Sequence, residues 1–257
     1  MMRTARFVTF TAIAAGLVLG GAGCSSILGI DDFTTGTTAP DGMTDGADGT
    51  ASSARIEGTI TLYSGATLLP SHPASASVTW SAIASGAVQA STTTDASGHY
   101  LLDLTALPAM RTGQIATSFS SNLTEYDVPG TVTMPIQAHL NAYDQPAFDE
   151  LVTRAGMTRI SGSGTLVAIV ESAARTPVAG AVVTSDPVIG TVVYGDASGF
   201  PRSDLGATTS SGTAWFFNAT PGTSYTLFAS AGGAQYADTY GHVLFTDDLR
   251  YAAVIPP

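Results

Sequence analysis

Short stretches in which apolar and polar residues alternate dominate the chain after residue 55, and they constrain its fold most strongly. In RIEGTITLY (55–63), Ile56, Gly58, Ile60 and Leu62 occupy every second position. An alternation of period two places one set of side chains on a single face of a β-strand. The stretches are short and end in clusters of Gly, Pro, Asp and Ser. They therefore predict an all-β fold with many turns.

The order of these segments occurs twice along the chain. ASVTW (76–80) and TTTDASGHYLLDL (92–104) follow the first strand, and TPVAGAVVTS (176–185) and TTSSGTAWFFNATPGTSYTLFAS (208–230) follow GTLVAIV (164–170). Gly58 and Gly98 serve as landmarks in the first half, and Gly164 and Gly212 in the second. The longer second interval fits an inserted hairpin around VYGDASGFPR (193–202). The repetition predicts two β-sandwich modules in tandem, module 1 (55–143) and module 2 (158–257).

The landmarks resemble the carboxypeptidase regulatory-like domains, whose fold is a prealbumin-like (transthyretin-like) β-sandwich of the Ig-like kind. The matching residues are Pro177, Gly180, Ala181 and Val183, then Thr94, Asp95, Gly98 and Tyr100, and lastly Pro221, Gly222 and Tyr225. Ser210 and Ala214 depart from the pattern, at positions where Asp and an aromatic residue are expected. In this family the domain often follows a catalytic domain, and this chain contains no recognisable one.

A short helix is expected in the linker between the modules, residues 144–157. In DQPAFDELVTRAG (144–156) the residues Phe148, Leu151, Val152 and Ala155 fall on one helical face. Pro146 suits the first helical position and Gly156 suits the C-terminal cap. The helix is expected to pack on one module or between the two.

The first 23 residues have the layout of a secretory signal. Arg3 and Arg6 precede an apolar run, Phe7 to Leu19, which is shorter than the roughly 20 residues that a membrane-spanning helix needs. Ala22 and Gly23 before Cys24, the only cysteine, resemble the lipobox of bacterial lipoproteins, although Gly21 stands where Leu is usual. The resemblance implies cleavage before Cys24 and acylation of that residue. The alternatives are an ordinary signal peptide with a bystander cysteine and an uncleaved anchor.

Residues 24–54 are expected to form a lipidated cysteine followed by a flexible, disordered acidic tether. The segment is rich in Gly, Thr, Ser and Asp and has no basic residue and no periodicity. Such a segment buries too little apolar surface to offset its ordering entropy. A chain of this length has a root-mean-square reach of about 30 Å. The acylated Cys24 would hold the modules on the bilayer, because two or more acyl chains anchor a protein stably.

The composition argues against nucleic acid as a partner. The chain has 257 residues and a net charge of −11, and its nine basic residues are all Arg. A phosphate backbone requires a basic footprint, and the sequence shows none.

No motif of a catalytic or metal site stands out, and neither a metal nor a cofactor is expected. The histidines, His72, His99, His139 and His242, are isolated in the sequence, and there is no HExxH motif. SGSG (161–164) does not match the G-x-S-x-G nucleophile elbow, which also requires an α/β sheet.

A few aromatic residues of module 2 are candidates for contact with a ligand. If Ala214 and Phe216 face the core, Trp215 and Phe217 point outward together, and Tyr194 and Phe200 lie in the inserted hairpin. Exposed aromatic rings stack on sugars or anchor partners. The favoured interpretation, however, is that the helix, the inserted hairpin or the other module covers Trp215 and Phe217.

The sequence therefore predicts a non-catalytic lipoprotein of the bacterial cell envelope, located in the outer membrane. Its role would be display, adhesion or scaffolding, with the bilayer and an envelope protein or glycan as partners. A carbohydrate-binding surface protein is the first alternative. An enzyme of an unrecognised type, which would need a cluster of acids or histidines with perturbed pKa values, is the second.

Overall fold

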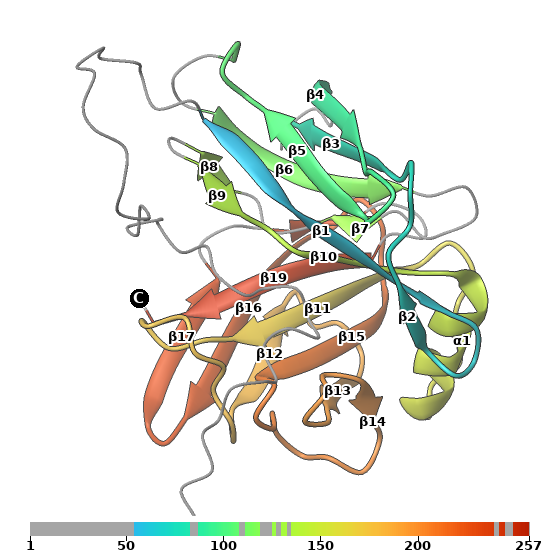
Figure 1. Cartoon of the computed structure of the whole chain (residues 1–257). Coiled ribbons are helices and arrows are strands. Elements are labelled where there is room, and N and C mark those ends of the chain that lie inside the picture. Colours follow the sequence, from blue (N-terminus) through green and yellow to red (C-terminus); the bar gives the residue numbers. More distant parts are fainter. Residues whose placement is uncertain are drawn as a thin grey trace, which may run out of the picture.

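The computed structural model describes residues 54–82, 87–107, 111–118, 125–126, 130–132, 135–238, 242–244 and 249–256. It consists of β-strands with one α-helix, and the strands form two β-sandwiches, one above the other in Figure 1. The all-β fold with one connecting helix is confirmed. The predicted signal and tether lie outside the described residues. Among the residues described, no helix has the length and apolar character needed to cross a bilayer.

Module 1 contains the first ten strands. They are β1 (Arg55–Ser64), β2 (Leu69–Ser71), β3 (Ser77–Ser81), β4 (Val88–Thr93), β5 (His99–Asp103), β6 (Arg111–Ser118), β7 (Glu125–Tyr126), β8 (Gly130–Val132), β9 (Ile136–Gln137) and β10 (Leu140–Tyr143). In one sheet, β1 pairs antiparallel with β2 and β5 and parallel with β9 and β10. In the facing sheet, β3 lies between β4 and β6, and β6 also pairs with β7 and β8.

The alternation along the strands fixes the core of module 1. Ile56, Ile60 and Leu62 are buried together with side chains of the facing sheet, including Val78 and Trp80. Trp80 is a core residue, as its position in the pattern predicts. Gly58 is required in β1, because a Cβ atom there would lie 1.8 Å from the carbonyl oxygen of Ala138.

Module 2 contains the other nine strands. They are β11 (Gly164–Val170), β12 (Val182–Asp186), β13 (Val192–Gly195), β14 (Pro201–Arg202), β15 (Thr213–Ala219), β16 (Ser224–Ala231), β17 (Ala234–Asp238), β18 (His242–Val243) and β19 (Leu249–Ile255). One layer has the order β14-β13-β15-β11-β19. The other contains β16 with its neighbours β12, β17 and β18. The core between them includes Leu166, Val183, Phe216, Leu227 and Val254.

The two modules share the pairing of their first and last strands, which supports the predicted repetition, although β4 pairs with β3 in module 1 and β13 pairs with β15 in module 2. In each, the first strand pairs parallel with the last, β1 with β10 and β11 with β19. A threonine makes the same contacts in both modules. Thr94 Oγ1 donates to the carbonyl of Pro73 and accepts from the N–H of Ala76, and Thr208 Oγ1 does the same with Val178 and Ala181.

The hydrogen bonds also correct the predicted landmarks. The N–H of Ile60 donates to Gly98, and the N–H of Val170 donates to Gly212. Ile60 is therefore equivalent to Val170, and Gly58 does not correspond to Gly164. The same equivalence places Thr209, and not Ser210, at the position of Asp95.

The predicted helix is α1 (Gln145–Arg154), in which Pro146 takes the second position and not the expected first, and Gly156 follows the C-cap residue Ala155. The side chain of Asp144 caps the N-terminus by accepting from Ala147, and a proline occupies the first turn. At the other end the N–H of Gly156 donates to Thr153 and that of Met157 donates to Val152. This pair of bonds is a Schellman motif, which uses the positive φ of 66° at Gly156.

Candidate functional site

A third apolar cluster, the junction cluster, joins the two modules and the helix. It buries residues from β1, β10 and the β1–β2 turn of module 1, from α1 and its C-cap, and from one face of a module 2 sheet. They are Tyr63, Leu68, Tyr143, Ala147, Phe148, Leu151, Val152, Ala155, Val167, Ile169, Val193, Trp215, Phe217, Leu249 and Tyr251. The β13-β15-β11-β19 layer is therefore buried on both faces, with its own sandwich core on one side and the junction cluster on the other.

The predicted outward aromatic pair lies in this cluster. Trp215 and Phe217 do point away from the core of module 2, but they are only 0% and 3% exposed. Their rings stack at 5.8 Å, and Trp215 Nε1 donates to the carbonyl of Gly199 at 2.8 Å. The candidate ligand contact is therefore not supported, and the favoured interpretation holds: the helix, the hairpin and module 1 cover the two rings.

Tyr194 is also buried and has a structural role. Its hydroxyl accepts from the N–H of Val183 at 3.1 Å, across the sandwich. Val183 lies on β12, which pairs only with β16 among the described strands. Tyr194 therefore satisfies a backbone donor on the outer edge of β12 and is not a ligand contact, contrary to the prediction.

Phe200 is half-buried and packs against the junction cluster. The ring of Tyr63 meets it edge-on at 5.6 Å, and the guanidinium of Arg154 lies 5.9 Å from its centre. A cation over an aromatic ring is attracted by the ring quadrupole. The ring is therefore engaged by the protein itself, and the predicted ligand contact is not supported. None of the four candidate aromatics offers an open platform.

Polar contacts also cross between the modules. The hydroxyls of Tyr143 and Tyr251 lie 3.2 Å apart, and Arg250 Nη1 donates to Gln114 Oε1 at 3.0 Å, both in buried positions. The backbone of β7 pairs with β6 of module 1 and with β19 of module 2. The modules are thus joined by a shared sheet, by hydrogen bonds and by a common apolar cluster.

A sequence signal for this double burial exists in β11. GTLVAIV is a continuous apolar run without alternation, and all seven residues are buried. Strands that are buried on both faces have such continuous apolar sequences, whereas in strands with one solvent-exposed face apolar and polar residues alternate. The run thus indicates a second covering layer, although it does not identify that layer.

Three of the four histidines lie near the same point of β1. His72 Nδ1 is 3.0 Å from the carbonyl oxygen of Ile60, His139 Nδ1 is 2.8 Å from Thr59 Oγ1, and His99 pairs with Thr59 across the sheet. Each contacts the backbone or a hydroxyl. Among the described residues, no group of three His, Cys, Asp or Glu side chains could hold a metal ion.

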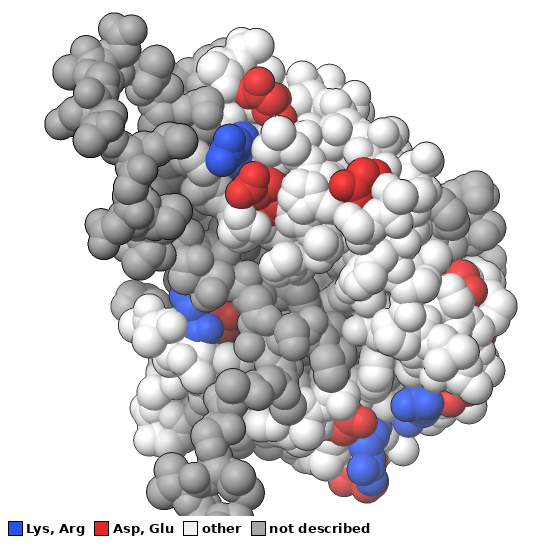
Figure 2. Space-filling model, viewed as in Figure 1, with Lys and Arg blue, Asp and Glu red and all other residues white. Residues whose placement is uncertain are grey.

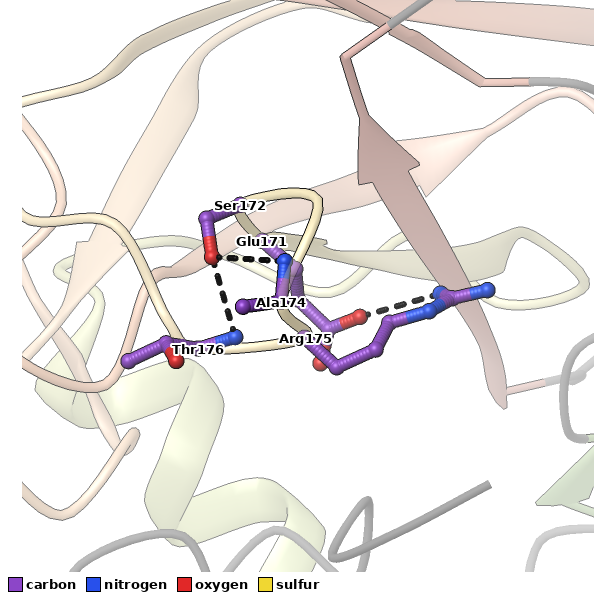
Figure 3. A network of polar contacts seen from close by, with 5 residues as sticks. All are labelled: Glu171, Ser172, Ala174, Arg175 and Thr176. Atoms are coloured by element: carbon purple, nitrogen blue, oxygen red, sulfur yellow. Dashed lines mark hydrogen bonds and ion pairs between the residues drawn. The ribbon is translucent and has the colours of Figure 1, made fainter. Parts of the chain in front are cut away.

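Glu171 is a buried carboxylate at the end of β11, and it belongs to the turn in Figure 3. Its side chain is 2% exposed, and Oε2 lies 3.2 Å from Nη1 of Arg175. Ser172 Oγ accepts from the N–H groups of Ala174 and Thr176 in the same turn. Burial raises the pKa of Glu171, although the hydrogen bond and charge of Arg175 oppose the shift. The carboxylate is enclosed and paired, so it has no room for a substrate.

Two aspartates organise identical turns, one of which the sequence interpretation missed. Asp95 Oδ1 accepts from the N–H groups of Ser97 and His99, and Asp196 Oδ1 accepts from those of Ser198 and Phe200. The repeated letters DASG at 95–98 and 196–199 are the signal. The hydroxyl of Ser97, followed by these backbone donors, lowers the pKa of Asp95. Both carboxylates therefore stabilise turns.

The fold and the junction define an all-β protein of two joined β-sandwiches. No protein-family model matches the chain, and no curated protein matches it. The resemblance to carboxypeptidase regulatory-like domains therefore stays a prediction. Lipidation of Cys24 also stays a prediction, since that residue lies outside the described residues.

Solved structures with some similarity to the chain include Gram-positive pilins. The shaft pilin SpaA of Lactobacillus rhamnosus GG, as a double mutant, is 11% identical over 80% of this chain and 98% of that chain, with a TM-score of 0.27. The minor pilin GBS52 of Streptococcus agalactiae is 9% identical over 80% and 97%, with a TM-score of 0.24. The TIE protein of Bacillus anthracis is 14% identical over 79% and 34%, with a TM-score of 0.24. Scores this low leave the role of this chain open.

Proposed function

We propose that the chain is a non-catalytic, lipid-anchored protein of the bacterial cell envelope that displays a rigid pair of β-sandwiches. Cys24 would carry the lipid, residues 25–54 would act as the spacer, and the joined modules would be the displayed body. The outer membrane is the proposed location. The role is scaffolding or adhesion, in which a fixed surface is held away from the bilayer.

The observation that carries this proposal is the junction cluster. A flexible string of two domains has a small and polar contact between them, and the domains move relative to each other. Here the contact instead buries Trp215, Phe148 and Tyr251 among the side chains of both modules and the helix. A rigid body of this kind suits a protein whose task is to present a surface in fixed geometry.

The position of the tether also supports display. The described chain begins at Ala54, directly before β1, and α1 contacts the opposite end of β1, where Asp144 Oδ1 accepts from the N–H of Gly65 at 3.0 Å. Ten residues of strand span about 33 Å. The helix therefore lies at the other end of β1 from the point where the spacer enters, beside the junction of the two modules (Figure 1).

Several charged groups of the described body have structural partners. Arg154 pairs with Glu150 on the helix, Arg202 pairs with Asp204 beside β14, and Asp144 caps α1. These contacts stabilise the surface and the helix. Their arrangement fits a binding or display role better than the acid–base chemistry of the enzyme alternative.

The anchoring is tested by intact-mass spectrometry of the membrane fraction, with Cys24→Ala as the control. The wild-type chain is expected to begin at Cys24 and to carry a diacylglyceryl group and an acyl chain. The variant should be unmodified and should leave the membrane. An unmodified, water-soluble wild-type chain would contradict the proposal. Crosslinking in intact cells would then identify neighbours of the displayed body.

A further inference from the structure

The outer edge of β4 differs from the edges of the described strands β2, β5, β12 and β14. A strand edge presents backbone N–H and C=O groups that can pair with another strand, and proteins usually protect it. The edge of β12 is capped by the hydroxyl of Tyr194. The short edge strands β2 and β14 contain Pro70 and Pro201, and β5 ends in the exposed Asp103.

Strand β4 has none of these protections. Its sequence is VQASTT, with neither proline nor charge, and residues 73–94 contain no Asp, Glu, Arg or Lys. Val88 is 61% exposed, and Gln89, Ser91 and Thr93 are also exposed. Among the described strands β4 pairs only with β3. In Figure 2 the surface over β4 itself is white, acidic atoms lie beside it, and further charged atoms lie near α1 and β14.

The register identifies the backbone groups on this edge. The N–H of Thr94 donates to the carbonyl of Ala76, so the backbone N–H and C=O groups of Thr94 point toward β3. Antiparallel pairs alternate between bonded and non-bonded. Thr92, opposite Val78, therefore also faces β3, whereas the N–H and C=O groups of Ser91 and Thr93 point to the outer side.

We propose that β4 is a self-association edge, on which β4 of a second copy pairs antiparallel across a twofold axis at Thr92. In this register Ser91 of each copy lies opposite Thr93 of the other, and the two residues exchange backbone hydrogen bonds. Pairs of Thr and Ser across strands stabilise antiparallel sheets. A twofold contact of one patch with itself is the commonest form of homo-oligomer.

Charge limits where two copies of the chain can meet. Each chain carries a net charge of −11, so two copies repel each other over most approaches. The uncharged β3–β4 hairpin is where two copies meet with the least repulsion. On an anchored protein this contact would join neighbours side by side. It does not depend on the lipid, and it stands or falls separately from the proposed function.

Cysteine crosslinking tests the register in the full-length chain with Cys24→Ala, which leaves no other cysteine. The twofold arrangement places the two Thr92 Cα atoms about 4.5 Å apart, within the range of about 4.4–6.8 Å that a disulfide spans. Val88 lies on the same strand, but its two copies would be about 26 Å apart. Thr92→Cys should therefore give a disulfide dimer of about twice the monomer mass under mild oxidation. Val88→Cys should stay monomeric.

Hydrogen exchange in the chain with native β4 gives a second test that needs no new cysteine. The amides of Ser91 and Thr93 should gain protection as the protein concentration rises, while the amide of Val182 on β12 should not change. The proposal would be overturned if Thr92→Cys gave no dimer at the highest protein concentration reached and the Ser91 and Thr93 amides also stayed unprotected. Equal crosslinking of Val88→Cys would overturn it too, because that result requires another register.

Discussion

The hydroxyls of Tyr143 and Tyr251 meet at 3.2 Å inside the junction cluster, and 108 residues separate them in the chain. Tyr143 ends β10 of module 1, and Tyr251 lies on β19, the last strand of module 2. The ring of Tyr143 also stacks on Tyr63 at 5.2 Å and meets Trp215 edge-on at 6.5 Å. Tyr143 of module 1 thus contacts both β19 and Trp215 of module 2.

Removing either hydroxyl should weaken this contact. Tyr143→Phe and Tyr251→Phe should each lower the free energy of unfolding by about 1 kcal/mol. The double variant should lose less than the sum of the single losses, because the two hydroxyls share one hydrogen bond. Urea unfolding of the four proteins gives this cycle. Additive losses would show that the hydroxyls do not interact.

Trp215 should behave as a core residue. Trp215→Ala should lower the free energy of unfolding by about 3–5 kcal/mol, because the indole fills space between the helix and two sheets. Phe228→Ala is the matched control, since that ring is 41% exposed on the outer face of β16 and its loss should fall within about 0.5 kcal/mol. Equal losses at the two positions would argue that Trp215 is not covered.

Tyr194 should protect the edge of β12. Tyr194→Phe removes the acceptor for the N–H of Val183 and leaves a buried donor unsatisfied, which costs about 1–3 kcal/mol. The Val183 amide should exchange faster with solvent in the variant, while the amide of Leu227 in β16 should be unaffected. An unchanged exchange rate at Val183 would show that the Tyr194 hydroxyl does not protect this amide.

Glu171 should make stability depend on pH. Burial raises its pKa, so the folded state holds the proton more tightly than the unfolded state does. The neutral carboxyl thus adds stability that is fully present below the ordinary glutamate pKa of about 4.3. That stability is lost as the pH rises through the raised value.

The comparison of wild type with Glu171→Gln measures this effect. The stability of the wild type relative to the variant should fall across that pH window and level off above it. Arg175→Gln should move the window to higher pH, because Arg175 lowers the pKa of Glu171. A difference between wild type and Glu171→Gln that is constant from pH 4 to pH 7 would contradict the shift.

The elements of the fold were predictable because their signals are local. The alternation of Ile56, Ile60 and Leu62 depends on neighbouring residues only, and so does the helix end at Gly156. The burial of the aromatic residues, by contrast, depends on segments that are distant in the sequence. Trp215 shows its outward direction in the sequence, but its cover comes from α1 and from Tyr143 of module 1. Periodicity does not report such contacts between distant segments.

The same limit explains the errors at Tyr194 and in the alignment of the repeats. The partner of the Tyr194 hydroxyl is a backbone N–H on a different sheet, which no spacing rule reveals. The equivalence of Ile60 with Val170 depends on hydrogen bonds to Gly98 and Gly212 and not on matching glycines. The turn of Asp196, by contrast, repeats the letters of the Asp95 turn and could have been found from the sequence.

The central claim is that the two sandwiches form one cooperative body, and the two tryptophans of the chain test it most directly. Trp80 lies in the core of module 1, and Trp215 lies in the junction cluster on module 2. Trp215→Phe and Trp80→Phe each leave one reporter. Urea unfolding of each single-tryptophan chain, followed by fluorescence and by circular dichroism, compares the reporter with the whole chain. In each variant the two signals should change together in one transition. A fluorescence transition separate from the circular dichroism transition would show that the modules unfold independently and would contradict the claim.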